Sequence, residues 1–142
     1  MRIIRQFYGI ASLVSLGTGM GIYLFFRNTN MLLFEWIPKL NNLNNVYIPV
    51  KHSFFNSILL YNLPDALWFL SGILFIRFLW FNNKKWQEIY IIWFYVIAII
   101  IETSQILKTS PGTFDVLDLF FIGIAAFVEG LSYKKLSRRS TK

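Results

Sequence analysis

Four long apolar runs constrain the fold of this 142-residue chain more than any other feature. An α-helix rises about 1.5 Å per residue, so about 20 apolar residues are needed to cross a hydrocarbon core roughly 30 Å thick. We therefore expect an all-α fold, an integral membrane bundle of four transmembrane helices that forms a single membrane domain over 1–142. The runs that predict these helices cover about 7–26, 64–81, 86–107 and 115–133.

The composition supports a membrane protein and excludes several kinds of site. Hydrophobic residues make up 56% of the chain and charged residues only 15%, against about 45–50% and about 25% in soluble domains. The chain has no cysteine, which excludes disulfides, zinc–thiolate sites and iron–sulfur clusters. A glycine-rich phosphate loop, an HExxH motif and a nucleophile elbow are also missing from the sequence. We expect neither a metal site nor a cofactor.

The distribution of lysine and arginine predicts the orientation of the helices, because short loops rich in these residues stay on the cytoplasmic side of a membrane. With four spans, one side carries nine of them: Arg2, Arg5, Lys84, Lys85 and five in a tail at 134–142. The other side carries four: Arg27, Lys39, Lys51 and Lys108. We therefore expect both termini and the basic tail in the cytoplasm. The net charge of +7 then reflects topology and attraction to the lipid bilayer, and we expect no nucleic-acid partner.

The first external loop, 27–63, is rich in asparagine but is not uniformly polar. Two of its stretches, 31–37 and 46–61, carry several aromatic and aliphatic side chains. We expect interfacial helical segments here, because Trp and Tyr are favoured at the level of the lipid headgroups. The alternative is a lid over the outer mouth of the bundle, and the sequence does not separate the two.

The acidic residues gather on the side opposite to most of the bases. In the predicted orientation, Asp65 opens the second span, Glu102 lies near the outer end of the third, and Asp115 and Asp118 open the fourth. Glu102 and Gln105 are three positions apart and share a helix face, as do Asp115 and Asp118. A short turn makes the third and fourth helices antiparallel neighbours, so the two polar faces are able to meet. These five residues are the candidate ligand-binding site.

Three of these acids also have a structural explanation. Asp115 stands at an N-cap position with Asp118 three positions later, and Asp65 follows Pro64 in the first turn of its span. Acids at such positions satisfy free backbone N–H groups and complement the helix dipole. Glu102 lies far from a helix N-terminus, and a carboxylate inside a span costs about 2.5–3.5 kcal/mol. We therefore leave open whether the other three are only helix caps, and we expect Glu102 to have a partner or a function.

Other polar or small residues fit structural roles. Arg77 is close enough to the cytoplasmic end of its span to snorkel, and Glu129 near the same leaflet is a candidate ion-pair partner. Gly17 and Gly21 form a GxxxG motif, which marks helix packing either within a bundle or between copies. His52, the only histidine, lies in the external loop, where we expect it to be solvated.

Two polar motifs lie in the third and fourth runs: Glu102-Thr-Ser-Gln105 and Gly112-Thr-Phe-Asp115-Val-Leu-Asp118. They resemble the C-terminal signature of VanZ-like membrane proteins, which have E-x-x-Q in one membrane helix and D-x-x-D at the start of the next. The proline and Asp65 at the start of the second run resemble the opening of that family's second helix. The resemblance covers about 63–130.

This chain departs from the family pattern at three places. It lacks the basic residue before Phe114, the asparagine that the family has at the position of Ile122, and the histidine within 67–69. The resemblance implies a small, multi-pass protein of the bacterial inner (plasma) membrane and the cell envelope, whose biochemistry is poorly defined. The name-giving members of the family are linked to resistance against the glycopeptide teicoplanin.

Three functions are consistent with these features. In the first, the outer carboxylates bind a polar or cationic ligand, an envelope lipid or a glycopeptide-related ligand, with a role in the envelope or in antibiotic resistance. In the second, the chain is a membrane-embedded enzyme acting on a lipid or envelope substrate, with Glu102 or Asp118 as general acid or base. In the third, it is an accessory subunit with a membrane-protein partner. Whether the chain is an enzyme stays open at this point.

Overall fold

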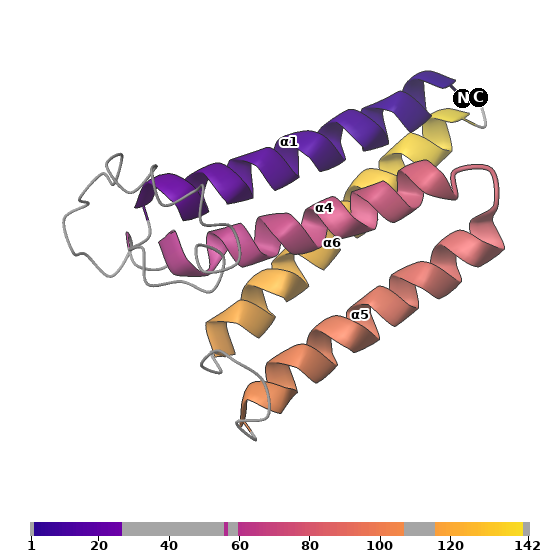
Figure 1. Cartoon of the computed structure of the whole chain (residues 1–142). Coiled ribbons are helices and arrows are strands. Elements are labelled where there is room, and N and C mark those ends of the chain that lie inside the picture. The colour runs from indigo at the N-terminus through magenta and orange to yellow at the C-terminus, as the bar shows by residue number, and fades with distance from the viewer. Residues whose placement is uncertain (1, 27–55, 57–59, 107–115, 141–142) are drawn as a thin grey trace.

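The described part of the chain is helical. The computed structural model describes residues 2–26, 56, 60–106 and 116–140. Within these ranges it has four helices and no strand: α1 (Arg2–Phe26), α4 (Leu63–Leu79), α5 (Lys84–Ile106) and α6 (Val116–Ser140) (Figure 1). Of these, α1, α5 and the segment Val116–Tyr133 of α6 are long and apolar enough to cross a membrane. The all-α prediction is confirmed, and the helices suit a membrane protein.

Several helix boundaries differ from the predicted spans: α1 begins at Arg2 and α5 at Lys84, both earlier than predicted, and the ends of α4 and α6 also differ. α4 ends at Leu79, because the chain turns there: the N–H of Trp80 donates to the Ile76 carbonyl and the N–H of Asn83 to the Trp80 carbonyl. α6 continues to Ser140, through the residues predicted as a tail, since Lys, Arg and Leu are good helix formers. Most of the loop 27–63 lies outside the described residues, so its interfacial helices and the alternative lid stay predictions.

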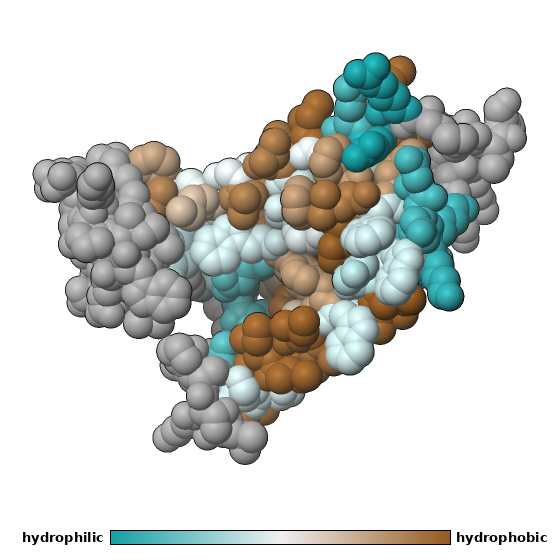
Figure 2. Space-filling model, turned by 45° about the vertical axis from the view of Figure 1, so that its right-hand side comes forward, coloured by the Kyte–Doolittle hydropathy of each residue, from teal (hydrophilic) through white to brown (hydrophobic). Residues whose placement is uncertain are grey.

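α4 lies at the centre of the bundle and contacts α1, α5 and α6, most extensively α1. Both ends of the chain lie at the same end of the bundle (Figure 1). We call this end the basic pole, after Arg2, Arg5, Lys84 and Lys85, and the opposite end the acidic pole, after Asp65, Glu102 and Asp118. Hydrophilic colour gathers at the basic pole, while much of the surface between the poles is apolar (Figure 2).

The buried core lies where α4 meets α5 and α6. It consists of Ala66, Phe69, Ile73, Ile91 and Ala125, against which Phe94 stacks with its ring centroid 5.1 Å from that of Phe69. Most large apolar side chains elsewhere are exposed, including four isoleucines between positions 97 and 101 of α5. Apolar surface of this extent is rare on soluble monomers and fits contact with lipid.

Small residues let α1 and α4 approach closely. Ser12 Oγ donates to the Ser71 carbonyl at 3.0 Å, and Ser71 Oγ donates back to the Ser12 carbonyl at 2.9 Å. One turn further, Ser15 Oγ donates to the Leu67 carbonyl at 2.8 Å. These bonds satisfy the serine hydroxyls inside an apolar interface, where an unpaired hydroxyl would be costly.

The glycine motif of α1 lies on another face. A Cβ atom added to Gly19 would lie 2.7 Å from Trp68 Cδ1, so this glycine permits the close approach of the two helices. At Gly17 and Gly21, an added Cβ would have nothing within 4 Å. The GxxxG motif therefore does not mediate packing among the described helices.

Candidate functional site

Three helices turn a stripe of side chains toward one another, and each stripe is apolar in the middle and polar at both ends. The stripes follow from sequence spacing, because positions three and four apart lie on one helix face. The buried or partly buried members are Asn62, Ala66, Phe69, Ile73 and Arg77 on α4 and its N-cap, Gln87, Ile91, Phe94, Ala98, Glu102 and Gln105 on α5, and Asp118, Ile122, Ala125 and Glu129 on α6. Their polar ends form two layers, the basic-pole layer (Arg77, Gln87, Glu129) and the acidic-pole layer (Asn62, Glu102, Gln105, Asp118).

The basic-pole layer is a hydrogen-bonded set with one residue from each of the three helices. Arg77 Nε donates to Glu129 Oε1 at 2.6 Å, and Arg77 Nη2 donates to Glu129 Oε2 at 3.3 Å. Arg77 Nη1 donates to Gln87 Oε1 at 2.7 Å, and Gln87 Nε2 donates back to the Arg77 carbonyl at 3.3 Å. The side chains of Arg77 and Glu129 are only 8% and 3% exposed. This layer therefore joins α4, α5 and α6 through a buried ion pair.

An aromatic ring covers the ion pair. The Arg77 Cζ atom lies 3.7 Å from the ring centroid of Tyr133, a cation–π contact that adds to the pair. The predicted pairing of Arg77 with Glu129 is confirmed, but the guanidinium turns into the bundle rather than snorkelling to its surface. Sequence reasoning missed Gln87, although its place four residues before the buried Ile91 was a signal that it faces inward.

The acidic-pole layer joins α4 to α6 in a different way. Asn62 Nδ2 donates to Asp118 Oδ1 at 2.7 Å, which ties the N-cap of α4 to the first turn of α6. A helix cap alone does not account for this bond, because it crosses between two helices. Asp65 is partly buried in the first turn of α4 at the same pole. Asp115 lies outside the described residues.

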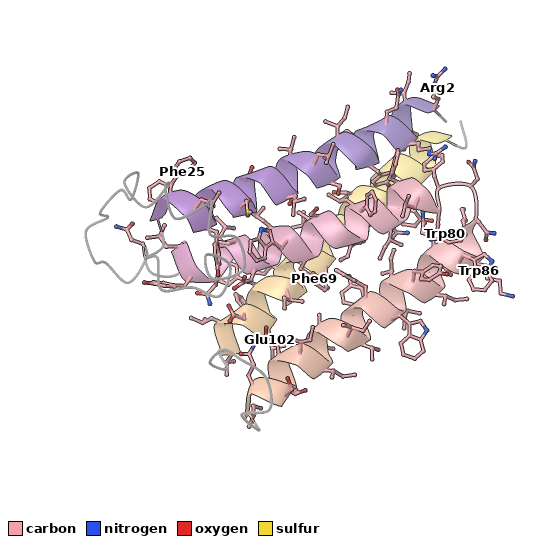
Figure 3. All side chains as sticks on the ribbon, in the orientation of Figure 1. Arg2, Phe25, Phe69, Trp80, Trp86 and Glu102 are labelled. Carbon is pink, nitrogen blue, oxygen red and sulfur yellow. The ribbon has the colours of Figure 1, made fainter. Side chains whose placement is uncertain are left out.

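Glu102 and Gln105 bring a carboxylate and an amide to the same pole from α5. Glu102 lies on the part of α5 beside the start of α6 (Figure 3). The Glu102 Oε2 and Gln105 Oε1 atoms are both out of reach of solvent. The face that these two residues share is thus the inward one. The structure therefore brings four of the five predicted residues, Asp65, Glu102, Gln105 and Asp118, to one pole.

This arrangement suits a ligand that donates hydrogen bonds. A carboxylate in apolar surroundings binds N–H and O–H donors, above all charged ones, more strongly than it does in water. Within the described ranges, no group of three His, Cys, Asp or Glu side chains is placed to hold a metal ion. The chemistry that these side chains offer is acceptance of hydrogen bonds from an ammonium group or a hydroxyl group.

No family model, curated protein or solved structure matches this chain. The resemblance to VanZ-like proteins therefore rests on the motif residues themselves. Of these, the structure describes Asp65, Glu102, Gln105 and Asp118, all at the acidic pole.

Proposed function

We propose that this chain is a VanZ-like, multi-pass protein of the bacterial inner membrane that binds a polar or cationic ligand, such as the amine headgroup of an envelope lipid, at its acidic pole. One observation carries the ligand site. On the inward face of a largely apolar helix, Glu102 Oε2 and Gln105 Oε1 lie one turn apart, and both are out of reach of solvent.

Three helices of suitable length and apolar composition support the membrane placement, and in this proposal α4 is the fourth span. Its 17 residues extend about 25 Å, somewhat less than a hydrocarbon core of about 30 Å. α4 contacts the other three helices, and its polar ends, Asn62 and Arg77, are buried against protein. Trp80 follows directly, at a depth where aromatic rings are favoured.

Both termini lie in the cytoplasm in this proposal, because the basic pole carries most of the lysine and arginine. The chain has no cysteine, so single cysteines report topology without background. We expect a membrane-impermeant maleimide to label Ser110→Cys in intact spheroplasts and Asn82→Cys only after lysis. The reverse pattern would overturn the orientation, and labelling of both positions before lysis would overturn the four-span arrangement.

The ligand proposal is tested with phosphatidylethanolamine, whose ammonium group donates hydrogen bonds, and phosphatidylcholine, whose headgroup does not. Native mass spectrometry of the protein released from micelles counts the lipids that it retains. We expect the wild-type protein to retain phosphatidylethanolamine preferentially and Glu102→Gln to lose that preference. The loss follows from replacing a charged acceptor by a neutral one of the same shape.

Glu88→Gln is the matched control, because it removes an exposed carboxylate from the opposite end of the same helix. It should leave the preference unchanged, and helical circular dichroism should show that both variants are folded. Equal retention of the two lipids by the wild-type protein, or equal losses in the two variants, would overturn the ligand proposal.

A further inference from the structure

The turn between α4 and α5 gathers three aromatic rings at the basic pole. The ring of Trp80 stacks on that of Tyr90 with centroids 5.0 Å apart, and Trp86 lies 6.2 Å from Trp80 and 6.0 Å from Tyr90. Trp86 and Tyr90 are nevertheless 45% and 41% exposed. Trp80 and Trp86 lie side by side at the tip of the hairpin (Figure 3). The cluster is therefore an ordered aromatic surface that the other helices do not cover.

Positive charge lies directly beside these rings. Lys84 and Lys85 are exposed in the first turn of α5, and that turn has no acidic residue. The dipole of a helix makes its N-terminus positive, so lysines there add to the field instead of neutralising it. Glu88 is exposed one turn further along α5 but forms no ion pair with either lysine. Figure 2 shows hydrophilic residues beside paler residues of intermediate hydropathy at this end of the molecule.

The combination of rings and lysines selects one class of partner. Trp and Tyr side chains are favoured at the level of the glycerol backbone of lipids, and lysines extend from there toward the phosphates. Bases of a nucleic acid also stack on aromatic rings, but in the proposed membrane placement these rings lie at the level of the lipid glycerol backbone, which a nucleic acid or an acidic protein in the cytoplasm does not reach. In the proposed membrane placement, this turn lies in the headgroup layer, where anionic lipids are concentrated.

We propose that the α4–α5 turn binds an anionic phospholipid at the basic pole. Lys84 and Lys85 hold its phosphate, while Trp86 and Tyr90 pack against its glycerol backbone and upper acyl chains. This inference rests on the proposed membrane placement and is independent of the ligand at the acidic pole. Because a lysine near an anionic membrane surface contributes about 1 kcal/mol, or about fivefold in affinity, two lysines correspond to at most about thirtyfold.

Native mass spectrometry with phosphatidylglycerol and phosphatidylcholine added to the micelles tests the proposal. We expect the wild-type protein to prefer phosphatidylglycerol, and we expect Lys84→Gln/Lys85→Gln to weaken that preference five- to thirtyfold. Lys134→Gln/Lys135→Gln is the matched control, since it removes two adjacent lysines of α6 at the same pole. The control should keep the preference. Equal losses in the two double variants would overturn the site in favour of diffuse attraction.

A variant that keeps both lysines distinguishes binding of the whole lipid from binding of its phosphate group alone. Trp86→Leu should also weaken retention of phosphatidylglycerol, because the ring contacts apolar parts of the lipid, and soluble glycerol phosphate should not displace the lipid. Unchanged retention by Trp86→Leu, or displacement by glycerol phosphate, would overturn a lipid site. A protein that stays dispersed without detergent would overturn the membrane placement itself, whereas a micelle-bound protein without preference for phosphatidylglycerol overturns only this inference.

Discussion

The two polar layers belong to the same three stripes, yet they join the helices differently. At the basic pole, Arg77 bonds to both α5 and α6 and is almost completely buried. At the acidic pole, Asn62 joins α4 to α6, while Glu102 and Gln105 extend from α5. The same alternation of polar and apolar positions along a stripe thus leads to a buried ion pair at one end and, in our proposal, to a ligand site at the other.

The attachment of α5 explains this difference. Its two buried residues, Gln87 and Ile91, both lie near the basic pole, and Phe94 stacks on α4 one turn further. Beyond Ala98, most of its apolar side chains are exposed. The buried residues of α5 thus lie near the basic pole, and Glu102, whose Oε2 atom is out of reach of solvent, lies toward the other end of the helix.

Removal of Arg77 should cause the largest loss in the free energy of unfolding. Arg77→Leu leaves the buried Glu129 without its ion-pair partner, and breaking a buried pair on one side costs about 3–5 kcal/mol. The measurement is the free energy of unfolding, obtained from helical circular dichroism as sodium dodecyl sulfate is added to mixed micelles.

The double variant Arg77→Leu/Glu129→Leu should recover part of this loss, because it leaves no charge buried alone. Glu88→Gln, at an exposed site, should change stability little. If Arg77→Leu were no more destabilising than Glu88→Gln, the basic-pole layer would not hold the bundle together.

Gln87→Leu should cause the next largest loss of stability, and the loss should be concentrated in α5. It removes the acceptor of Arg77 Nη1, and a hydrogen bond to a charged group contributes about 1.5–3 kcal/mol. Hydrogen exchange of the backbone amides should rise in α5 while it stays low where the serines join α1 to α4. An equal rise in both regions would show that the layer supports the whole bundle rather than α5.

The helices and the gathering of acids at one pole were predictable because they follow from local spacing. Runs of apolar residues set the helix lengths, and the spacing of Glu102 and Gln105 set their common face. The bond between Asn62 and Asp118 was not predictable, because its partners are 56 positions apart and Asn62 precedes its helix. Which inward polar residues meet depends on helix packing, which spacing alone does not determine.

The contact between α1 and α4 shows the same limit of prediction from sequence spacing. The GxxxG motif predicts close packing at Gly17 and Gly21, but α1 and α4 approach each other closely at Gly19. Two positions along a helix correspond to roughly 200° of rotation, so Gly19 lies on nearly the opposite face. A GxxxG motif indicates a helix surface that permits close packing. Whether another helix packs against that surface depends on the rest of the fold.

Gly72→Ala should loosen α5 between the two layers. A Cβ atom at Gly72 would collide with the ring of Phe94, and overpacking of this kind costs about 1–3 kcal/mol. Gly17→Ala is the matched control in α1, where an added Cβ meets nothing within 4 Å. The same unfolding measurement should show a loss for the first variant and no loss for the second. Equal stability of the two would mean that the contact of Phe94 with α4 is not tightly packed.

The smallest expected effect is that of Asp118→Asn at the acidic pole. Asparagine keeps a carbonyl oxygen that accepts the bond from Asn62 Nδ2, so only the charge is lost, and a neutral hydrogen bond still contributes about 0.5–1.5 kcal/mol. Since a hydrogen bond to a charged group contributes about 1.5–3 kcal/mol, we expect the free energy of unfolding to fall by the difference, about 1–1.5 kcal/mol, well below the loss for Arg77→Leu. A loss as large as that of Arg77→Leu would mean that both layers hold the bundle together. The acidic-pole layer would then stabilise the bundle as the basic-pole layer does. The different attachment of α5 at its two ends would not explain why Glu102 lies at the acidic pole.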